Sequence, residues 1–298
     1  MTGETPPAPP GLHLIATPIG NLRDITLRAL DLLHGAEVLA AEDTRTLRRL
    51  MELHAVPLRG RPMVSYHDHN GPAARPRLLA ALAAGRSVAY ASEAGTPLVA
   101  DPGYQLARAA IEAGHPVFAA PGPSALLAAL TVSGLPTDRF LFAGFPPPKA
   151  AARHRFLQEV AAIPATLVLF ESAKRIRETL ADLVQVAGAD RSAALCRELT
   201  KRFEDVRRGP LRALLQSVSD DPPRGEIVLV IDRPPPRAVT QGDLDAALLG
   251  VLGQHGLREA VQAVVAQTGL PRRQVYQAAL RLRGARRDGM DAEGDEPT

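Results

Sequence analysis

The sequence predicts a two-domain α/β protein, with a doubly wound, mostly parallel sheet in the first domain and a mixed sheet in the second. Short apolar runs alternate with helical patterns from Leu12 to about residue 135, which is typical of a parallel sheet. This rhythm breaks around residues 134–149, and a second set of apolar runs follows. A chain of 298 residues that is 46% hydrophobic is large enough to bury two cores.

The first domain, residues 12–134, is expected to alternate strands and helices. Its apolar runs predict strands at residues 12–16, 37–41, 63–66, 87–91 and 116–120. Helical patterns fall between them, near residues 24–34, 43–53, 73–85 and 103–113. Because ligands of parallel sheets bind at the carboxyl ends of strands, the loops after these strands are the expected place for a ligand.

The second domain, residues 135–233, has apolar runs with less regular connections. They predict strands at residues 140–144, 166–171, 193–197 and 226–231. A proline-rich linker at residues 232–240 leads into a purely helical pattern at residues 241–284. The two ends of the chain, residues 1–11 and 285–298, are expected to be disordered.

Two strand-end loops of the first domain have a composition that suits a ligand site. After the strand that ends at Ala91, Gly95 and Pro97 shape a loop, and Asp101-Pro102 is expected to open the next helix. In the second loop, Gly122 permits close backbone approach and Ser124 is expected to start a helix. One such loop is an ordinary strand–turn–helix connection, but two at neighbouring strand ends predict a site lined by backbone. A side chain added at Gly95 or Gly122 is expected to occupy ligand space.

Several kinds of site are disfavoured by the motifs. There is no G-x-G-x-x-G after the first strand and no P-loop, so a dinucleotide or nucleoside triphosphate site is not expected. The stretch 66–70 places His67 and His69 around Asp68, but no third spaced ligand is evident, and a structural or substrate-contacting loop is favoured over a metal site. The lone Cys196 lies in an apolar run, which favours inert packing.

The amino-terminal stretch has no basic region followed by an apolar one, and no apolar run approaches the length of a membrane span. We therefore expect a cytoplasmic protein.

Charged residues gather at strand ends in the second domain. Glu171 ends a strand, Ser172 is expected to cap the next helix, and Lys174 and Arg175 fall in its first turn, where the helix dipole disfavours cations. Lys201 and Arg202 follow the next strand. These basic groups are either solvated surface residues or contacts for an anionic polymer.

Eight stretches, taken together, carry a resemblance to a known family. They are TPIGNLRDITLRAL, AEDTRTLRRL, SYHDHN, AGTPLVADPGYQL, APGPSALLAAL, SGLPTDRFLFAGFPP, FESAKR and RELTKRFEDVRRG. In this order and spacing the sequence closely resembles the ribosomal RNA small subunit methyltransferase I family, within the tetrapyrrole-methylase superfamily. The resemblance extends from Leu12 to about Arg283. It implies an S-adenosylmethionine-dependent homodimer that methylates the ribose 2′-oxygen of a decoding-centre cytidine in 16S rRNA.

The resemblance also implies site residues. Contacts to the methyl donor are assigned to Thr17, Pro18, Ala94, Gly95, Thr96, Pro97, Val99, Ser124, Ala125 and Phe170. For the transfer step, Glu171 and Lys201 are candidate bases, Lys201 only if burial makes it neutral, and Asp24 and Arg175 are candidates to position the ribose or its phosphates. Structural ion pairing is the alternative for each of these four. No metal is required.

Two departures from the family pattern affect the expected pocket. Glu93 stands where the family has aspartate, and FESAKR lacks the usual tyrosine and proline. Two other functions stay open: a small-molecule methylase acting on a tetrapyrrole carbon, and a non-catalytic RNA-binding protein with a methylase fold. Gly95-Thr96-Pro97, where tetrapyrrole methylases usually have Gly-Asp-Pro, counts against the first.

The helical segment at residues 241–284 resembles a helix-turn-helix unit. Apolar residues at helical spacing, Leu257 to Val265, precede Gly269 and Pro271, which separate them from a second apolar face. Basic residues gather on and beyond the second helix; they are Arg272, Arg273, Arg281, Arg283, Arg286 and Arg287. This predicts an arm that holds rRNA phosphates, with a solvated helical pair as the alternative.

Overall fold

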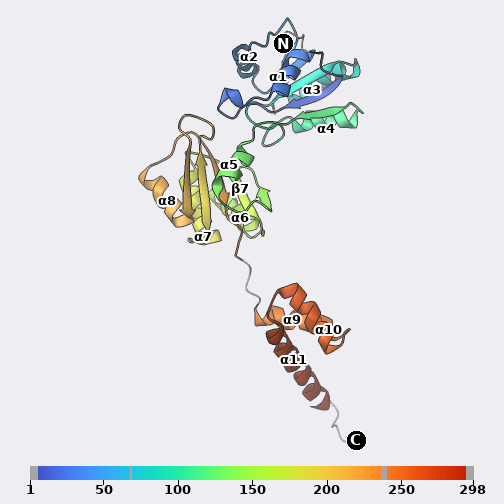
Figure 1. Cartoon of the computed structure of the whole chain (residues 1–298), viewed down its shortest axis with the longest axis vertical. Coiled ribbons are helices and arrows are strands. Elements are labelled where there is room, and N and C mark those ends of the chain that lie inside the picture. Colours follow the sequence, from blue (N-terminus) through green and yellow to red (C-terminus); the bar gives the residue numbers. More distant parts are fainter. Residues whose placement is uncertain (1–5, 68, 236–239, 293–298) are drawn as a thin grey trace. The chain divides into compact units, whose positions relative to one another are not determined.

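The structure is a computed structural model that describes residues 6–67, 69–235 and 240–292, the last nine of these by backbone only. The chain forms two compact units, Met1–Pro234 and Pro235–Thr298 (Figure 1). The first unit contains both sheets, and the second is helical. None of the helices in the described ranges is long and apolar enough to cross a membrane.

The first sheet is entirely parallel, as predicted. Its strands are β1 (Gly11–Ile15), β2 (Val38–Ala41), β3 (Met63–Ser65), β4 (Ser87–Ala91) and β5 (Val117–Ala120), in the order β3-β2-β4-β1-β5. Each lies within one residue of its predicted bounds at either end, because apolar runs buried on both faces mark such strands clearly. The order places β1 between β4 and β5, so the loops after these three strands are neighbours in space.

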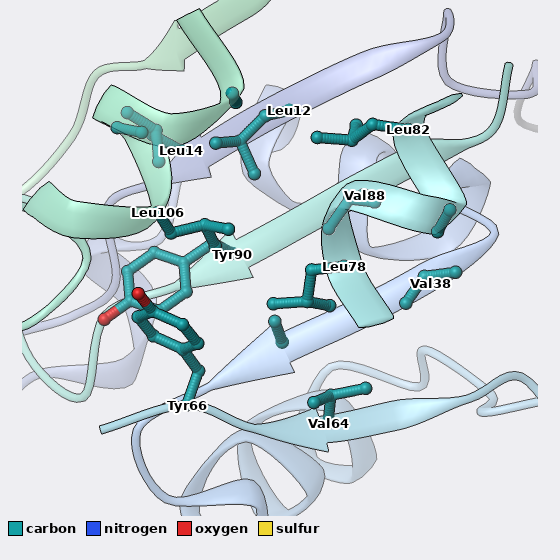
Figure 2. Close-up of a cluster of buried hydrophobic side chains, with 14 residues drawn as sticks. Leu12, Leu14, Val38, Val64, Tyr66, Leu78, Leu82, Val88, Tyr90 and Leu106 are labelled. Atoms are coloured by element: carbon teal, nitrogen blue, oxygen red, sulfur yellow. The ribbon is translucent and has the colours of Figure 1, made fainter. Parts of the chain in front are cut away.

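Helices cover both faces of this sheet, which makes it doubly wound. One face packs against α3 (Gly71–Ala83) and α4 (Tyr104–Glu112). The other packs against α1 (Leu27–Gly35) and α2 (Thr44–Leu53), and a short 3-10 helix, η1 (Leu22–Asp24), precedes α1. Figure 2 shows the α3/α4 face, where leucines and valines pack beside the edge-to-face pair of Tyr66 and Tyr90.

The second sheet is mixed, which confirms the prediction. It consists of β6 (Phe140–Phe142), β7 (Thr166–Ser172), β8 (Ser192–Arg197), β9 (Asp205–Pro210) and β10 (Glu226–Ile231), in the order β6-β7-β10-β8-β9. Only β6 and β7 pair in parallel; the other neighbours are antiparallel. Strand β9 is absent from the prediction because its sequence, DVRRGP, is polar, as an edge strand can be.

The second sheet is also covered on both faces. One face packs against α6 (Ala150–Ala161), α7 (Ile176–Ala187) and α8 (Leu211–Asp220). The other packs against α5 (Ala125–Ser133), where Ala129 and Leu130 meet Cys196 and Val228. Burial raises the pKa of the Cys196 thiol to about 11, in agreement with a packing role. The change from one sheet to the other therefore precedes α5, whereas the expected boundary at residue 134 follows it.

The second unit is a three-helix cluster. It contains α9 (Gln241–Leu252), α10 (Leu257–Thr268) and α11 (Arg272–Ala292), and the apolar faces of the three helices form one core. Gly269 ends α10 in the left-handed conformation, with φ +68°, as expected of a glycine stop.

The expectations for the chain ends differ from the structure. Helix α11 continues to Ala292, whereas disorder is expected from residue 285. Near the other end, the Ala8 amide donates to Gly35 at the end of α1, the His13 ring of β1 contacts the Pro9 carbonyl, and Gly11 is the first residue of β1. Residues 1–5 and 293–298 lie outside the described residues.

Candidate functional site

A cleft of about 480 Å³ lies where strand-end loops of the first sheet face the second sheet. The loops after β4 and β5 supply Gly95, Thr96 and Ser124, and the end of β7 supplies Phe170 and Glu171. The start of β10, residues 226–228, completes the wall. The volume is in the range of a small-molecule site.

The loop after β4 is held in an unusual backbone conformation beside this cleft. Gly95 has φ +82°, and two non-glycine residues, Leu98 and Ala100, have φ +68° and +54°. Such conformations cost about 1–3 kcal/mol each and persist where the surroundings determine them. Here the Thr17 amide donates to the Gly95 carbonyl and the Gly95 amide donates back, both at 3.0 Å. Thr17 therefore fixes the loop from behind.

A second set of bonds joins the loops after β4 and β5. The Thr96 hydroxyl donates to the Pro123 carbonyl at 3.0 Å, and Ser124 caps α5 by accepting from the Leu127 amide. The two loops that the sequence singles out thus form one backbone surface. This is the arrangement that the prediction of a backbone-lined site requires.

Asp101 does not start the next helix, contrary to expectation. Helix α4 begins at Tyr104, and one Asp101 oxygen accepts from the Leu98 and Gly103 amides and from the Tyr90 hydroxyl at 2.8 Å. Burial and the charge of Asp101 raise the pKa of Tyr90 far above its usual range, so the phenol stays protonated and donates. Asp101 therefore ties the strained loop to β4 and also lines the cleft.

The loop after β1 reaches the second sheet at Gly20 and Asn21. A Cβ at Gly20 would collide with the side chain of Lys201 and would lie 2.9 Å from the Thr200 hydroxyl. The Asn21 amide donates to that hydroxyl at 3.0 Å. Glycine is therefore required at position 20 by close approach, because its φ is not positive. The adjacent Ile19 lines the cleft.

Glu171 lies at the base of the cleft and is 2% exposed. One of its oxygens is 2.7 Å from an Arg175 guanidinium nitrogen and accepts from the Ser172 amide; the other accepts from the Thr179 hydroxyl at 2.7 Å. Arg175 also donates to the Pro146 carbonyl at 3.0 Å. This network fixes the end of β7 to the loop after β6.

Ser172 does not cap a helix, contrary to expectation. It is the last residue of β7, and α7 begins at Ile176. Lys174 and Arg175 therefore precede the helix rather than occupying its first turn.

Lys201 is held as a cation. Its ammonium group lies 2.9 Å from Glu198 and 2.8 Å from Glu226. Desolvation by itself would lower the pKa of Lys201, but hydrogen bonds and charge interactions with these two carboxylates outweigh it and raise the pKa. The condition under which Lys201 could act as a neutral base is therefore not met in this structure.

The charged residues that line the cleft are acidic. Five carboxylates line it, those of Glu42, Glu93, Asp101, Glu171 and Glu226, and no lysine or arginine is found among the lining residues within the described part of the chain. Phe145, which is 55% exposed, and Phe170 add an aromatic wall with ring centroids 5.6 Å apart. Such a lining suits a cationic ligand with an apolar or aromatic part and opposes a phosphate.

Comparison with known proteins assigns the family. A family model described as Tetrapyrrole (Corrin/Porphyrin) Methylases matches residues 11–215, and one described as the RsmI C-terminal HTH domain matches residues 238–283. The chain is 45% identical over 294 residues to the ribosomal RNA small subunit methyltransferase I of Mesorhizobium japonicum, covering 97% of this chain and 99% of that protein. The chain belongs to the ribosomal RNA small subunit methyltransferase I family. The Synechocystis relative of the same name is 41% identical over 278 residues, covering 91% and 98%.

A solved structure agrees with the fold of this methyltransferase family. The uroporphyrin-III C-methyltransferase of Thermus thermophilus, complexed with S-adenyl homocysteine, has a TM-score of 0.52 at 20% identity. The match covers 74% of this chain and 97% of that one. At such identity it supports the fold alone, which confirms the expected tetrapyrrole-methylase architecture.

The structure brings most of the expected donor contacts together. The predicted residues that line the cleft are Ala94, Gly95, Thr96, Val99, Ser124, Ala125, Phe170 and Glu171. Thr17, Pro18 and Pro97 are buried behind the loops and are not part of the lining. Asp24 is exposed on η1, and Arg175 and Lys201 reach the cleft only through Glu171 and Glu226.

The expectation that a side chain at Gly122 would occupy ligand space is wrong. A Cβ there would lie 3.0 Å from the Ala16 Cβ rather than in the cleft, so Gly122 allows β1 and the loop after β5 to approach. At Gly95 a Cβ would lie 3.3 Å from Ile19, and the positive φ alone would strain any other residue.

Sequence reasoning missed the wall that the second sheet provides. Phe145 and Glu226 line the cleft from positions that only the tertiary fold brings beside Gly95. The only local signal for Phe145 is the proline run that follows it, which marks a loop. The rings of His67 and His69 lie 6.0 Å apart, but Asp68 between them lies outside the described residues. No cluster of three or more metal-ligating side chains occurs among the residues that were placed.

Proposed function

We propose that this protein transfers the methyl group of S-adenosylmethionine to the ribose 2′-oxygen of a decoding-centre cytidine in 16S rRNA. The observation that carries the proposal is the carboxylate-lined cleft at the strand ends, in a chain of this family. S-adenosylmethionine carries a sulfonium, an amine, a carboxylate and an adenosine but no phosphate, so its net charge is positive. Glu171 and Glu226 are paired with Arg175 and Lys201, so among the lining carboxylates it is chiefly Glu93 and Asp101 that attract that charge.

The strand-end loops suit the polar ends of such a donor. Residues 94–96 and 124–125 present backbone groups to the cleft, and the strained backbone at Leu98 and Ala100 keeps this surface in one shape. Phe145 and Phe170 supply a wall on which the adenine can stack. A pre-formed site of this kind lowers the entropic cost of orienting the donor toward its acceptor.

The transfer itself needs alignment and the loss of one proton. The donor supplies a methyl group on sulfur; the ribose oxygen forms the new bond, the carbon–sulfur bond breaks, and the hydroxyl proton passes to a base or to water. Glu171 lines the cleft, but its oxygens are occupied by Arg175, Ser172 and Thr179. We therefore assign Glu171 the positioning of Arg175 and of the end of β7, rather than the acceptance of the proton.

The test uses small ribosomal subunits from a strain of the source organism that lacks this gene. Incubation with the purified protein and S-adenosylmethionine, followed by nucleoside mass spectrometry of the 16S rRNA, is expected to reveal new 2′-O-methylcytidine. Methylation at a base instead would overturn the assigned acceptor. Calorimetric titration that shows no binding of S-adenosylmethionine would favour a non-catalytic RNA-binding protein.

The helical unit is proposed to hold the rRNA. Arg272, Arg273 and Arg283 are exposed on α11, and the matching family model describes a helix-turn-helix domain. Arg281, which the sequence groups with them, instead pairs with Asp245 at 2.5 Å. The side chains of Arg286 and Arg287 lie outside the described residues.

A homodimer, working in the cytoplasm where ribosomes assemble, completes the proposal. Exposed apolar side chains lie at the edge strand β5 and at the start of α1: Phe118 is 42% exposed and Leu27 is 81%. Arg28 donates to the Ala119 carbonyl at 2.6 Å, which places the start of α1 beside β5. Light scattering is expected to give a mass of twice the 31.7 kDa of one chain. The Leu27→Glu variant is expected to give a lower mass, because a charge at this position weakens the interface. A wild-type mass of one chain at micromolar concentration would contradict this.

A further inference from the structure

Three loops meet at the edge of the cleft. The Asn21 amide donates to the Thr200 hydroxyl at 3.0 Å, which joins the loop after β1 to the loop between β8 and β9. The Glu226 amide donates to the Glu198 carboxylate at 2.9 Å, which joins that loop to the turn before β10. The loop after β1 contributes the cleft-lining residue Ile19, and the third loop leads directly into Glu226, the first residue of β10, which also lines the cleft.

Each of these loops carries an exposed arginine: Arg23, Arg202 and Arg224. None of the three forms an ion pair with any residue that the structure describes. The neighbouring Lys201, by contrast, is neutralised by Glu198 and Glu226. We call the exposed set, together with Phe203, the cleft rim. Free guanidinium groups beside a carboxylate-lined cleft mean that the charge changes sign between the rim and the interior.

Phe203 is the exposed aromatic of the rim. It is 64% exposed, and the Arg202 guanidinium lies 5.5 Å from the centre of its ring. Its loop is rigidly built: Glu198 and Thr200 have positive φ, the Thr200 amide donates to Glu204 at 2.6 Å, and Arg197 donates to the Phe203 carbonyl at 2.8 Å. A loop that is strained and cross-bonded in this way fixes the backbone that carries the ring, and the exposed ring contributes little to a core.

We propose that the cleft rim binds the single-stranded rRNA that flanks the methylated nucleotide, with phosphates on Arg23, Arg202 and Arg224 and one base stacked on Phe203. Unpaired bases stack on aromatic rings and guanidinium planes, and exposed arginines hold the phosphates between them. The rim binds the RNA phosphates and the acidic cleft binds the donor, because the cleft interior repels phosphates and attracts the cationic donor. This inference rests on the proposed function.

The experiment compares full-length variants by methyl transfer to small subunits and to protein-free 16S rRNA. Phe203→Ala and Phe203→Leu are expected to raise the KM for RNA about tenfold, since stacking needs the ring and not only apolar surface. Arg202→Ala is expected to reduce the slope of log KM against log salt by about 0.7, the contribution of one single-strand phosphate contact. Affinity for S-adenosylmethionine should stay within twofold of wild type in all three, which also shows that they fold.

Two matched controls lie at the starts of strands, at the opposite strand ends from the cleft. Phe140 is 42% exposed at the start of β6, and Arg86 is exposed just before β4, so both are remote from the strand ends that form the cleft. Phe140→Ala and Arg86→Ala are expected to leave the KM for RNA and the salt slope unchanged.

The outcomes separate this inference from the proposed function. A wild-type KM for RNA in Phe203→Leu, or an unchanged salt slope in Arg202→Ala, would overturn the rim. Defects on assembled subunits but not on protein-free rRNA would mean that the rim contacts a ribosomal protein, which also overturns it. If the wild type binds S-adenosylmethionine but methylates no rRNA, the proposed function fails. Fluorescence anisotropy with an rRNA fragment then tests RNA binding by the cleft rim directly. Equal affinities of the wild type and Phe203→Leu for that fragment would overturn the rim proposal.

Discussion

Replacing Glu171 by glutamine separates a positioning role from a chemical one. The substitution keeps the shape of the side chain and removes its charge, leaving the Arg175 guanidinium, which is 25% exposed, without its partner. Breaking a fully buried ion pair costs about 3–5 kcal/mol, and the partial exposure of Arg175 reduces this to about 2–3 kcal/mol. At about 2–4 °C per kcal/mol, the thermal midpoint is expected to fall by about 5–10 °C.

The kinetic expectation follows from the same contacts. Because Arg175 holds the Pro146 carbonyl beside Phe145, losing the pair loosens the wall of the cleft, so the KM for S-adenosylmethionine should rise. Removal of a general base would instead lower kcat by about 10²–10⁴-fold. Differential scanning calorimetry and steady-state kinetics on the same preparation measure both effects.

A pair of variants at Thr179 provides the control. Thr179→Val removes the hydroxyl that donates to Glu171 and is expected to cost about 1.5–3 kcal/mol, whereas Thr179→Ser keeps that hydrogen bond and loses only a methyl group. Both should leave kcat within a few-fold of wild type. If Glu171→Gln melts like the wild type while kcat falls a hundredfold or more, Glu171 acts in the chemistry and the positioning argument is refuted.

Three further expectations follow from the structure. Gly20→Ala should lower the free energy of unfolding by about 1–3 kcal/mol and weaken S-adenosylmethionine binding in calorimetry, because the added Cβ overpacks the Lys201 loop. Gly250→Ala, at a position with open space in α9, should leave binding unchanged. Equal effects of the two substitutions would refute the close-approach argument. Ending the chain after Pro236 should leave S-adenosylmethionine affinity unchanged while weakening RNA binding and its salt dependence, and full-rate methylation across a salt series would contradict an RNA-binding arm. Burial raises the pKa of Cys196 to about 11, above its unfolded value, so the contribution of this thiol to stability is present below about pH 9 and is lost as pH rises through about 11. A disulfide reagent is expected to react with Cys196 only when the protein unfolds. Fast reaction of the folded protein would contradict the burial of the thiol.

The strands of the first sheet could be predicted closely because each buried strand is a short, mostly apolar run in the sequence. In the run SVAYA every residue after Ser87 is apolar or aromatic, and the structure buries every residue of β4. Strand β9 carries no such pattern, since its DVRRGP is half exposed at the sheet edge. The assignment of α5 to the second sheet was also out of reach, because an apolar helix does not state which of two sheets it covers.

The candidate site was predictable on one side only. Glycine, proline and serine after β4 and β5 mark loops whose place at a sheet edge follows from parallel topology. Glu226 and Phe145 lie on the opposite wall, more than a hundred and about fifty residues away from Gly95 in the sequence, and neither begins a recognisable motif. Their role depends on how the second sheet packs against the first, which no local pattern encodes.

The net charge of +3 conceals the feature that best explains the site. Five carboxylates gather in the cleft, while the unpaired arginines Arg23, Arg202 and Arg224 gather at its rim. Under the proposed function, methyl transfer converts a donor of net positive charge into a neutral thioether, so the acidic lining favours the donor over its product. The same lining repels phosphates, so the rRNA backbone has to be held outside the cleft while a single ribose reaches inward. The segregation of charge therefore serves both substrates, and a composition that averages over the surface cannot reveal it.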